Sequence, residues 1–366
     1  MGQIVIMLIF GSLITLSFLK FANPLKVNKR ANFWLGVTFL IWASFWMEEI
    51  LLLADMKAAS GNIVLIVRFI QFLSPPIFFF SVILFTNPLY KFRLKDLIYA
   101  ILPAIYFIAI SIEYYGDWKN KEVIRILILA IILFQAMLYT GISYLAIRNH
   151  QKKILLFSSD TKGINLNWLE YIIVLIAIMC IVISGYNIIY YTADLNFQLN
   201  LFILTVIFFI AYYSLKQKEI YPVDEKHRRE LISINQQEFV SGAKRKLMTD
   251  EDLAEIVRRI NDVMQLNRPY LDSELNLIKL SELLSVTPHQ LSYVINTGFN
   301  GNFFHFINKF RVEEAKKLLL DHKKDNLSIL GIAYESGFNS KTSFNTTFKK
   351  ITGQTPSEFK KRSSTL

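Results

Sequence analysis

Seven long apolar segments restrict the fold more than any other feature of the chain. They occupy residues 3–22, 32–54, 62–86, 96–113, 123–147, 167–191 and 197–215. A helix needs about 20 apolar residues to cross the hydrocarbon core of a bilayer. Helices buried in a water-soluble core rarely reach that length, and seven in succession are typical of a membrane protein. We therefore expect an all-α chain whose residues 1–215 form a seven-helix transmembrane bundle.

The distribution of charge marks where this apolar part ends. Residues 1–215 carry 16 Lys/Arg and 10 Asp/Glu, whereas the shorter remainder, 216–366, carries 24 Lys/Arg and 19 Asp/Glu. The single cysteine, Cys180, lies within an apolar segment. It excludes an intrachain disulfide and a metal site built from cysteines.

Basic residues in the loops predict the orientation of the bundle, because cytoplasmic loops are enriched in Lys and Arg. If the N-terminus is outside, the inner loops hold eleven such residues and the outer loops hold three. The inner residues are Lys20, Lys26, Lys29, Arg30, Lys91, Arg93, Lys95, Arg148, Lys152, Lys153 and Lys162, and the outer ones are Lys57, Lys119 and Lys121. We therefore expect a multi-pass protein of the inner membrane whose C-terminal domain lies in the cytoplasm.

Four ionisable residues fall within or near the outer ends of the apolar segments: Glu48, Glu49, Arg68 and Arg125. A charge deep in a span costs roughly 2.5–3.5 kcal/mol on insertion scales, so it usually faces a partner or a cavity. Glu48 and Arg68 fall at similar depth and are candidates for a pair. The cluster is an outward-facing signal site, an ion pair with a structural role, or a set of side chains that snorkel to the membrane interface. Pro75-Pro76 interrupts the third segment. The pair either kinks this helix, which would make it a hinge, or marks an ordinary helix irregularity.

Residues 216–270 form a polar linker with one amphipathic helix, expected at 250–266. Apolar residues recur there at helical spacing, and Thr249 precedes them as a candidate N-cap. A short basic run, 244–246, lies before the helix. The helix either packs on the following domain or pairs with its copy in a dimer.

The last part of the chain repeats internally. Leu275–Ile295 aligns with Leu327–Phe348 at a shift of 52 residues, which becomes 53 because one residue is inserted in the second turn. Each copy has the pattern of two short helices joined by a tight turn, which is typical of a helix-turn-helix unit. A longer helix from Phe303 to Leu320, about 27 Å in length, is expected to separate the units and to expose Arg311.

Local signals within each copy support this interpretation. Asn276 and Ser328 are placed to cap the first helix of each unit. Gly337 follows the first helix of the second unit, where a glycine suits a C-cap. The pattern therefore predicts an all-helical domain with two helix-turn-helix units.

Two stretches carry a family resemblance: FINKFRVEEAKKLLL, and the later GIAYESGFNSKTSFNTTFKKITGQTPSEFKK run. Both are similar to the AraC-type DNA-binding domain, and the resemblance covers about 271–362, a quarter of the chain. It implies that both units bind a double-stranded DNA operator and that transcription is activated through contact with RNA polymerase.

The second helix of each unit is expected to enter the major groove. In the first unit, His289, Ser292 and Tyr293 are expected to face outward, at the positions that match the family's base-contacting ones. In the second unit, the outward residues are Lys341, Thr342, Asn345 and Thr346, of which Thr346 replaces a longer basic side chain common in the family. Lys349, Lys350 and Arg311 are expected to meet phosphates.

These features predict a membrane-bound, sequence-specific transcription regulator that senses a membrane or extracytoplasmic signal. Its expected partners are the lipid bilayer, operator DNA, RNA polymerase and an unidentified ligand, and a homodimer is one arrangement that the sequence leaves open. One alternative is a membrane receptor or transporter whose tail binds a protein, and another is a tethered regulator without a ligand. An enzyme is not expected, because the sequence has no glycine-rich phosphate loop and no metal-spaced cluster. Neither a metal nor a cofactor is expected.

Overall fold

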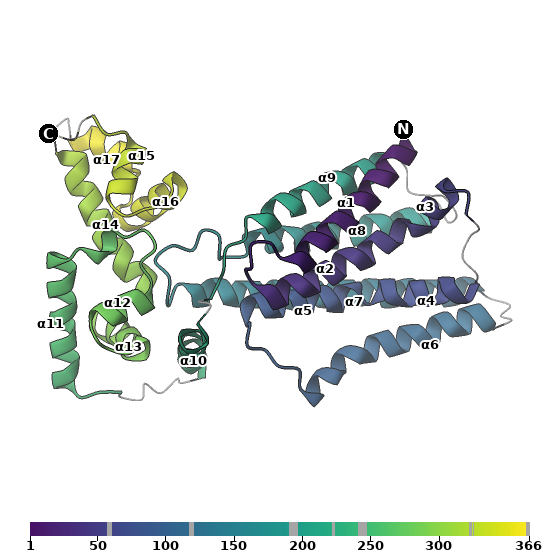
Figure 1. The fold of residues 1–366 in the computed structure, drawn as a ribbon, viewed down its shortest axis with the longest axis horizontal. Coiled ribbons are helices and arrows are strands. Elements are labelled where there is room, and N and C mark those ends of the chain that lie inside the picture. Colours follow the sequence, from purple (N-terminus) through teal and green to yellow (C-terminus); the bar gives the residue numbers. More distant parts are fainter. Residues whose placement is uncertain are drawn as a thin grey trace. The chain divides into compact units, whose positions relative to one another are not determined.

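The structure is a computed structural model that describes residues 1–56, 61–116, 121–189, 197–221, 224–240, 247–321, 324 and 326–363. These residues are predominantly helical and form no strand (Figure 1). The chain divides into two compact units, which we call the N-terminal unit (Met1–Asn149 and Leu166–Ile220) and the C-terminal unit (His150–Asn165 and Tyr221–Leu366). The all-α fold class expected from the sequence is confirmed.

Long apolar helices make up the N-terminal unit. They are α1 (Gly2–Ala22), α2 (Lys29–Ala43), η1 (Ser44–Trp46), α3 (Met47–Leu53), α4 (Gly61–Phe72), α5 (Ser74–Thr86), η2 (Leu94–Ala100), α6 (Ile101–Tyr115), α7 (Lys121–Ile154), α8 (Asn167–Ile189) and α9 (Phe197–Leu215). The end of α7 continues into the C-terminal unit.

Six helical stretches among the described residues are long and apolar enough to cross a membrane. They are Gly2–Ala22, Lys29–Leu53, Gly61–Thr86, Leu94–Tyr115, Glu122–Ile154 and Phe197–Leu215. A seventh apolar helix, Asn167–Ile183, is shorter. Each stretch falls on one of the seven expected segments. Lys57 and Lys119, counted above in the outer loops, and the basic run 244–246 lie outside the described residues.

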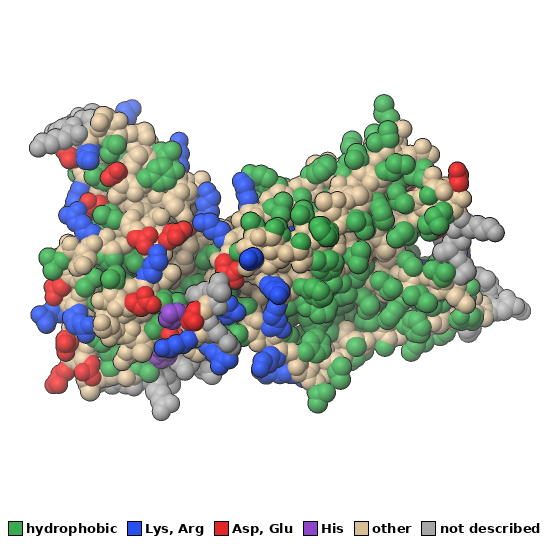
Figure 2. All heavy atoms as spheres, viewed as in Figure 1, with side chains coloured by type: hydrophobic (Ala, Val, Ile, Leu, Met, Phe, Trp, Pro, Cys, Tyr) green, Lys and Arg blue, Asp and Glu red, His purple; other side chains and the backbone are tan. Residues whose placement is uncertain are grey.

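The surface of the N-terminal unit is unusually apolar. Phe18, Leu94 and Ile126 have exposed fractions of 68%, 86% and 64%. Figure 2 shows hydrophobic side chains over most of the visible face of this bundle. Soluble proteins rarely expose apolar patches of this extent. The arrangement is the one expected of helices that are covered by lipid.

Inside the bundle, side chains bond to the backbones of neighbouring helices. Ser17 Oγ donates to the Gly36 carbonyl at 2.9 Å, and Ser81 Oγ donates to the Ala31 carbonyl at 3.0 Å. These bonds connect α1 and α5 to α2. The approach of α1 to α2 is close, since a Cβ at Gly36 would lie 2.9 Å from the Phe21 ring.

The third apolar stretch is interrupted at Leu73, between α4 and α5. Pro75 and Pro76 have no backbone N–H, so the carbonyls of Gln71 and Phe72 lose their usual donors four residues ahead. Gln135 of α7 replaces one of them, because its Nε2 donates to the Phe72 carbonyl at 2.7 Å. The interruption is thus held by a side chain from another helix.

The C-terminal unit contains nine helices in its described residues. They are α10 (Glu225–Val240), α11 (Asp250–Leu266), η3 (Pro269–Leu271), α12 (Leu277–Leu283), α13 (Pro288–Gly298), α14 (Phe303–Leu320), α15 (Ile329–Glu335), α16 (Lys341–Thr352) and α17 (Pro356–Ser363). Helices α11 and α14 have the bounds expected from the sequence. Helix α10 lies in the linker, where the sequence predicted one helix, 250–266.

The internal repeat appears as two helix-turn-helix units, α12–α13 and α15–α16. Asn276 caps α12 by accepting from the Lys279 N–H at 3.0 Å, and Ser328 caps α15 by accepting from the Gly331 N–H at 3.0 Å. Thr287 caps α13. Ser340 caps α16. The capping roles predicted for Asn276 and Ser328 are confirmed.

The two turns also share one hydrogen-bond pattern. Val286 N–H donates to the Ser281 carbonyl as Phe338 N–H does to the Ala333 carbonyl, which is the pattern of a Schellman C-cap. The residue at the turn has positive φ in both copies: 53° at Ser285 and 86° at Gly337. A Cβ at Gly337 would also collide with the Tyr270 carbonyl, so this turn requires glycine, whereas the first turn accommodates Ser285 at positive φ.

Candidate DNA-binding surface

Helix α16 presents the more open of the two candidate recognition faces. Phe344, Thr347 and Phe348 are buried against α14 and its neighbours. The opposite side carries five exposed residues and the half-buried Asn345; the exposed ones are Lys341, Thr342, Thr346, Lys349 and Lys350. This places every residue predicted for the second unit on one polar side of the helix. Its amide, hydroxyl and ammonium groups are the types that bond to base edges and phosphates.

Helix α13 differs from this pattern at Ser292. His289 and Tyr293 are half-buried, but Ser292 has an exposed fraction of 6% and does not face solvent. The expectation that Ser292 faces outward is therefore wrong for this structure. Helix α13 packs against α10, α11, α12 and α14, and the sequence did not predict α10 among them.

The packing of α10 has a clear basis in its sequence. Leu231 and Ile234 are buried, and they follow His227 at helical spacing. The His227 ring nitrogens lie 3.2 Å from an Asp224 carboxylate oxygen and 3.8 Å from one of Glu282 on α12. The spacing of these residues was the signal that would have predicted α10.

Arg311 is also placed differently from its prediction. Its exposed fraction is 1%, so it does not present its guanidinium to a phosphate. Its Nε donates to the Tyr270 carbonyl at 2.8 Å, and its Nη2 donates to the Asp272 carbonyl at 2.8 Å. Nη2 also bonds to Ser159 Oγ at 3.0 Å. Arg311 is therefore an internal cross-link of the C-terminal unit.

Burial lowers the pKa of Arg311 to about 10, while the carboxylates of Asp160 and Asp272 oppose this shift. The guanidinium therefore remains charged at neutral pH. In this solvent-excluded place its charge strengthens the hydrogen bonds to the surrounding carbonyls.

Ser159 belongs to a segment that the sequence places between two apolar helices, far from the helix-turn-helix units. Within the C-terminal unit, this segment, His150–Asn165, contacts both helix-turn-helix units. The Leu277 N–H at the start of α12 donates to the Phe157 carbonyl at 2.9 Å, and Ser158 forms a bridge with Asn276.

The same segment reaches the turn of the second unit. Asn339 Nδ2 donates to the Asp160 carboxylate. Asn339 is the residue inserted in this turn relative to the first unit. The residue that breaks the internal repeat is therefore also the one that bonds to Asp160. No sequence signal predicted that 150–165 would pack here, because its partners lie more than a hundred residues away along the chain.

In the N-terminal unit, the predicted charge cluster forms around Glu113 and not around a pair of Glu48 and Arg68. Arg68 does not pair with Glu48; its Nη1 lies 2.9 Å from Glu113 Oε2. Arg125 also approaches Glu113, at 3.7 Å, and pairs with Glu122 at 3.2 Å. Glu113 was not among the predicted residues, although it is the last residue of the fourth apolar segment.

The two acidic residues of the original cluster lie on the short helix α3. Glu48 is exposed and Glu49 is half-buried. The structure therefore joins Arg68 and Arg125 through one carboxylate, and does not bring Glu48 into that ion pair.

Two capped helix-turn-helix units, joined through the 18-residue helix α14, define a DNA-binding domain. Comparison with known proteins identifies its type. Residues 280–362 match the helix-turn-helix domain family, and the C-terminal part of this chain is an AraC-type helix-turn-helix domain. The resemblance of this part to the AraC type is confirmed.

Curated relatives are helix-turn-helix-type transcriptional regulators. An uncharacterized one from Staphylococcus aureus (strain COL) is 33% identical over 102 residues, which are 28% of this chain and 13% of the relative. One from Pseudoalteromonas carrageenovora is 34% identical over 115 residues, 30% of this chain and 66% of the relative. The chain thus spans only a small part of the staphylococcal relative. No solved structure matches the chain.

Proposed function

We propose that this protein is a membrane-bound, sequence-specific transcription regulator that couples a signal in the bundle to operator binding. One observation carries the proposal: a single chain contains an AraC-type helix-turn-helix domain and, among its described residues, six helical stretches long and apolar enough to cross a membrane. The bundle would lie in the inner membrane, with the C-terminal unit in the cytoplasm where the DNA is. RNA polymerase is the expected protein partner.

The exposed side of α16 supports specific readout of bases. Asn345 is suited to a bidentate contact with adenine once its buried Oδ1 turns outward, and Lys341 is suited to the acceptors of guanine. Thr342 and Thr346 lie on the same side, while Lys349 and Lys350 are suited to phosphates. From α13, His289 and Tyr293 would join them.

The chain path supports coupling between the two functions. The polypeptide passes from one unit to the other at Asn149–His150, at Asn165–Leu166 and at Ile220–Tyr221. A shift of the apolar helices at these points would act on His150–Asn165 and on α10. The former contacts both helix-turn-helix units and the latter packs on α13, so both are positioned to change operator affinity.

The test uses the full-length protein in lipid nanodiscs, since His150–Asn165 contributes to the C-terminal unit. The protein is used to select fragments from sheared genomic DNA, and enriched sequences are confirmed by gel shift. We expect enrichment of a common sequence that binds at least about a thousandfold more tightly than unrelated DNA. The double variant Lys341→Ala/Asn345→Ala should lose this preference.

Lys317→Ala is the matched control, because Lys317 is exposed on α14 and lies on neither recognition helix. It should retain the sequence preference. If no sequence is enriched and the C-terminal unit instead retains a protein from cell extract, the receptor or transporter alternative replaces this proposal.

A further inference from the structure

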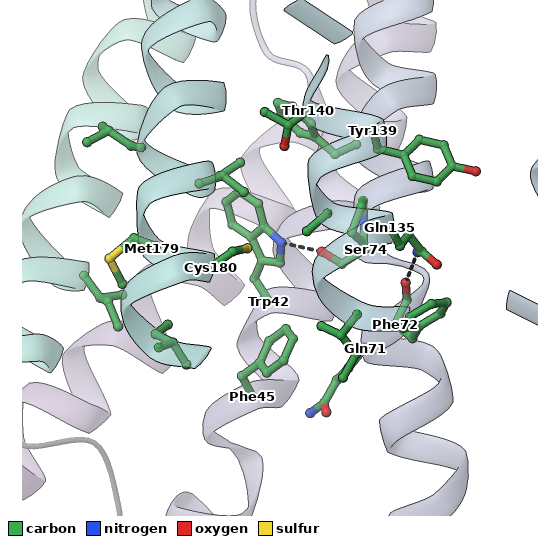
Figure 3. A pocket seen from close by; sticks show the side chains of 18 of the residues that line it. Trp42, Phe45, Gln71, Phe72, Ser74, Gln135, Tyr139, Thr140, Met179 and Cys180 are labelled. Carbon is green, nitrogen blue, oxygen red and sulfur yellow. Dashed lines mark hydrogen bonds between the residues drawn. The ribbon is translucent and has the colours of Figure 1, made fainter. Parts of the chain in front are cut away.

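The N-terminal unit contains a partly open, mostly apolar pocket of about 520 Å³ (Figure 3). Polar groups on its wall bond to the protein itself. Trp42 Nε1 donates to Ser74 Oγ at 2.7 Å, as Figure 3 shows. Arg68 is the one charged side chain among the described lining residues, and it lies 2.9 Å from Glu113. The acyl chains of a bilayer suit such a wall, so its chemistry points to no particular ligand.

In the C-terminal unit, a turn of the segment His150–Asn165 lies beside the start of the second recognition helix. Asp160 links the two, because its Oδ1 accepts from the Lys162 N–H at 3.0 Å and its Oδ2 accepts from Asn339 Nδ2. Asn339 directly precedes Ser340, which caps α16. One carboxylate therefore joins the backbone of Lys162 to the residue before this cap.

Hydrogen bonds on both sides of Lys162 hold the turn in place. The Ile164 N–H donates to the Thr161 carbonyl at 3.2 Å, and Gly163 between them has a positive φ of 91°. Before the turn, Asn308 Nδ2 of α14 donates to the Ser159 carbonyl at 3.1 Å. The backbone of Lys162 is therefore fixed next to α16.

The side chain of Lys162 adds positive charge at this place. It is exposed, and so is Lys341, the first residue of α16. Two cationic side chains thus extend from backbone next to the N-terminus of α16, which itself favours anions. Asp160 is the opposing charge, but it also interacts with the buried guanidinium of Arg311. The surroundings of the helix start therefore suit a phosphate.

We propose that Lys162 binds a phosphate of the operator at the edge of the major groove that α16 enters. In helix-turn-helix domains the N-terminal residues of the recognition helix contact base edges, so groups beside the start of that helix meet the neighbouring phosphates. Lysine suits this contact, since its ammonium group is a point charge on a flexible stem. The inference rests on the proposed function, because it requires an operator.

This contact belongs to neither helix-turn-helix unit. It comes from a loop between two apolar helices, and Lys162 lies five residues before the start of α8 at Asn167. A shift of α8 therefore acts on a phosphate contact through a short stretch of chain. The loop thereby supplies a route from the bundle to the operator that does not pass through α10.

The salt dependence of binding tests the contact, with the full chain in nanodiscs and the operator that it selects from genomic DNA. Lys162→Ala should weaken binding about five- to tenfold at about 0.1 M salt, and should reduce the slope of log affinity against log salt by about one. Lys162→Arg keeps the charge and should keep the slope. Lys317→Ala is the control, because it removes an exposed charge from α14, away from this turn; it should change neither quantity.

Ethylation interference gives the position of the contact on the DNA. With the unsubstituted protein, ethylation of one phosphate beside the bases read by α16 should weaken binding at least severalfold. In Lys162→Ala, ethylation of that phosphate should have no further effect.

The outcomes separate this contact from the function on which it rests. If the operator is bound but Lys162→Ala keeps the salt slope and the ethylation pattern, the contact is wrong and the proposed function stands, even where the affinity falls. If the unsubstituted protein selects no operator, the proposed function fails and the contact fails with it.

Discussion

At the scale of single residues, Arg311 shows how a charged side chain can belong to a core. Phe303, Ile307, Arg311, Ala315 and Leu319 recur every four residues along α14, and none has an exposed fraction above 3%. Arg311 therefore occupies the centre of the buried stripe. Its type suggested a phosphate contact, but its position in the helical period already indicated burial.

We predict that Arg311→Met destabilises the C-terminal unit. Methionine keeps most of the length but leaves the carbonyls of Tyr270 and Asp272 and the Ser159 hydroxyl without their donor. We expect a loss of at least about 3 kcal/mol, because three buried polar groups lose their donor and each costs about 1–3 kcal/mol. Hydrogen exchange of the α14 amides in the full-length protein measures this change.

Lys317→Met is the control, since Lys317 is exposed on the same helix. It should leave exchange nearly unchanged. The phosphate role would be restored to Arg311 if Arg311→Met kept normal protection and instead reduced the salt dependence of DNA binding by one ion.

Asn345 and Lys350 should have separable effects on DNA binding. We predict that Asn345→Ala changes the preferred base at one operator position, because a bidentate contact discriminates by roughly 1–3 kcal/mol. Lys350→Ala should weaken binding to all sequences alike and reduce the slope of log affinity against log salt by about one. Selection from a randomised operator library, repeated at several salt concentrations, measures both effects. A uniform loss of affinity in Asn345→Ala would remove it from the base-reading face.

At the scale of elements, local signals predicted what local interactions determine. Apolar periodicity located α11 and α14, and capping residues such as Asn276 and Ser328 located α12 and α15. The position of His150–Asn165 could not be predicted in this way. Its contacts with Leu277 and Asn339 depend on pairings across long chain separations, which leave no periodic signal. Helix α10 could be predicted in part: its apolar residues have helical spacing in the sequence, but nothing in the sequence indicates that it packs on α13.

Helix α10 should restrain the first recognition helix. Buried Ile234 lies on α10, and the packing of this helix against α13 accompanies the burial of Ser292. We predict that Ile234→Asp weakens this packing and tightens operator binding by about tenfold, which corresponds to releasing roughly 1.4 kcal/mol of competing interaction. Gel shift with the full-length protein gives the change in affinity.

The exposed neighbour Ser233 supplies the control. Ser233→Asp introduces the same charge on the same helix without disturbing the buried side, and should bind DNA as the unsubstituted protein does. Equal affinities for Ile234→Asp and Ser233→Asp would mean that α10 does not oppose DNA binding by α13.

At the scale of the whole molecule, the C-terminal unit is built from two separate stretches of the chain, and this limits the possible number of membrane spans. His150–Asn165 and Tyr221–Leu366 form one compact unit, and only α8 and α9 separate them along the chain. A folded unit cannot be divided by a bilayer, so both segments must lie on the same side. Helix α8 must therefore cross together with α9, or neither crosses. Because α9 is long and apolar enough to span, we expect seven spans and not six.

We predict the topology that follows, with the N-terminus outside and the C-terminus inside. Reporter fusions that are active only in the cytoplasm should be active at residues 92, 155 and 230 and inactive at residue 117, and a periplasmic reporter should give the reverse. Residues 155 and 230 form the decisive pair, because they flank α8 and α9 and carry parts of one folded unit. Opposite signals at these two positions would contradict both the seven-span arrangement and the compact C-terminal unit. A cytoplasmic signal at 117 would instead reverse the orientation, and would separate the helix-turn-helix units from the DNA that they are proposed to bind.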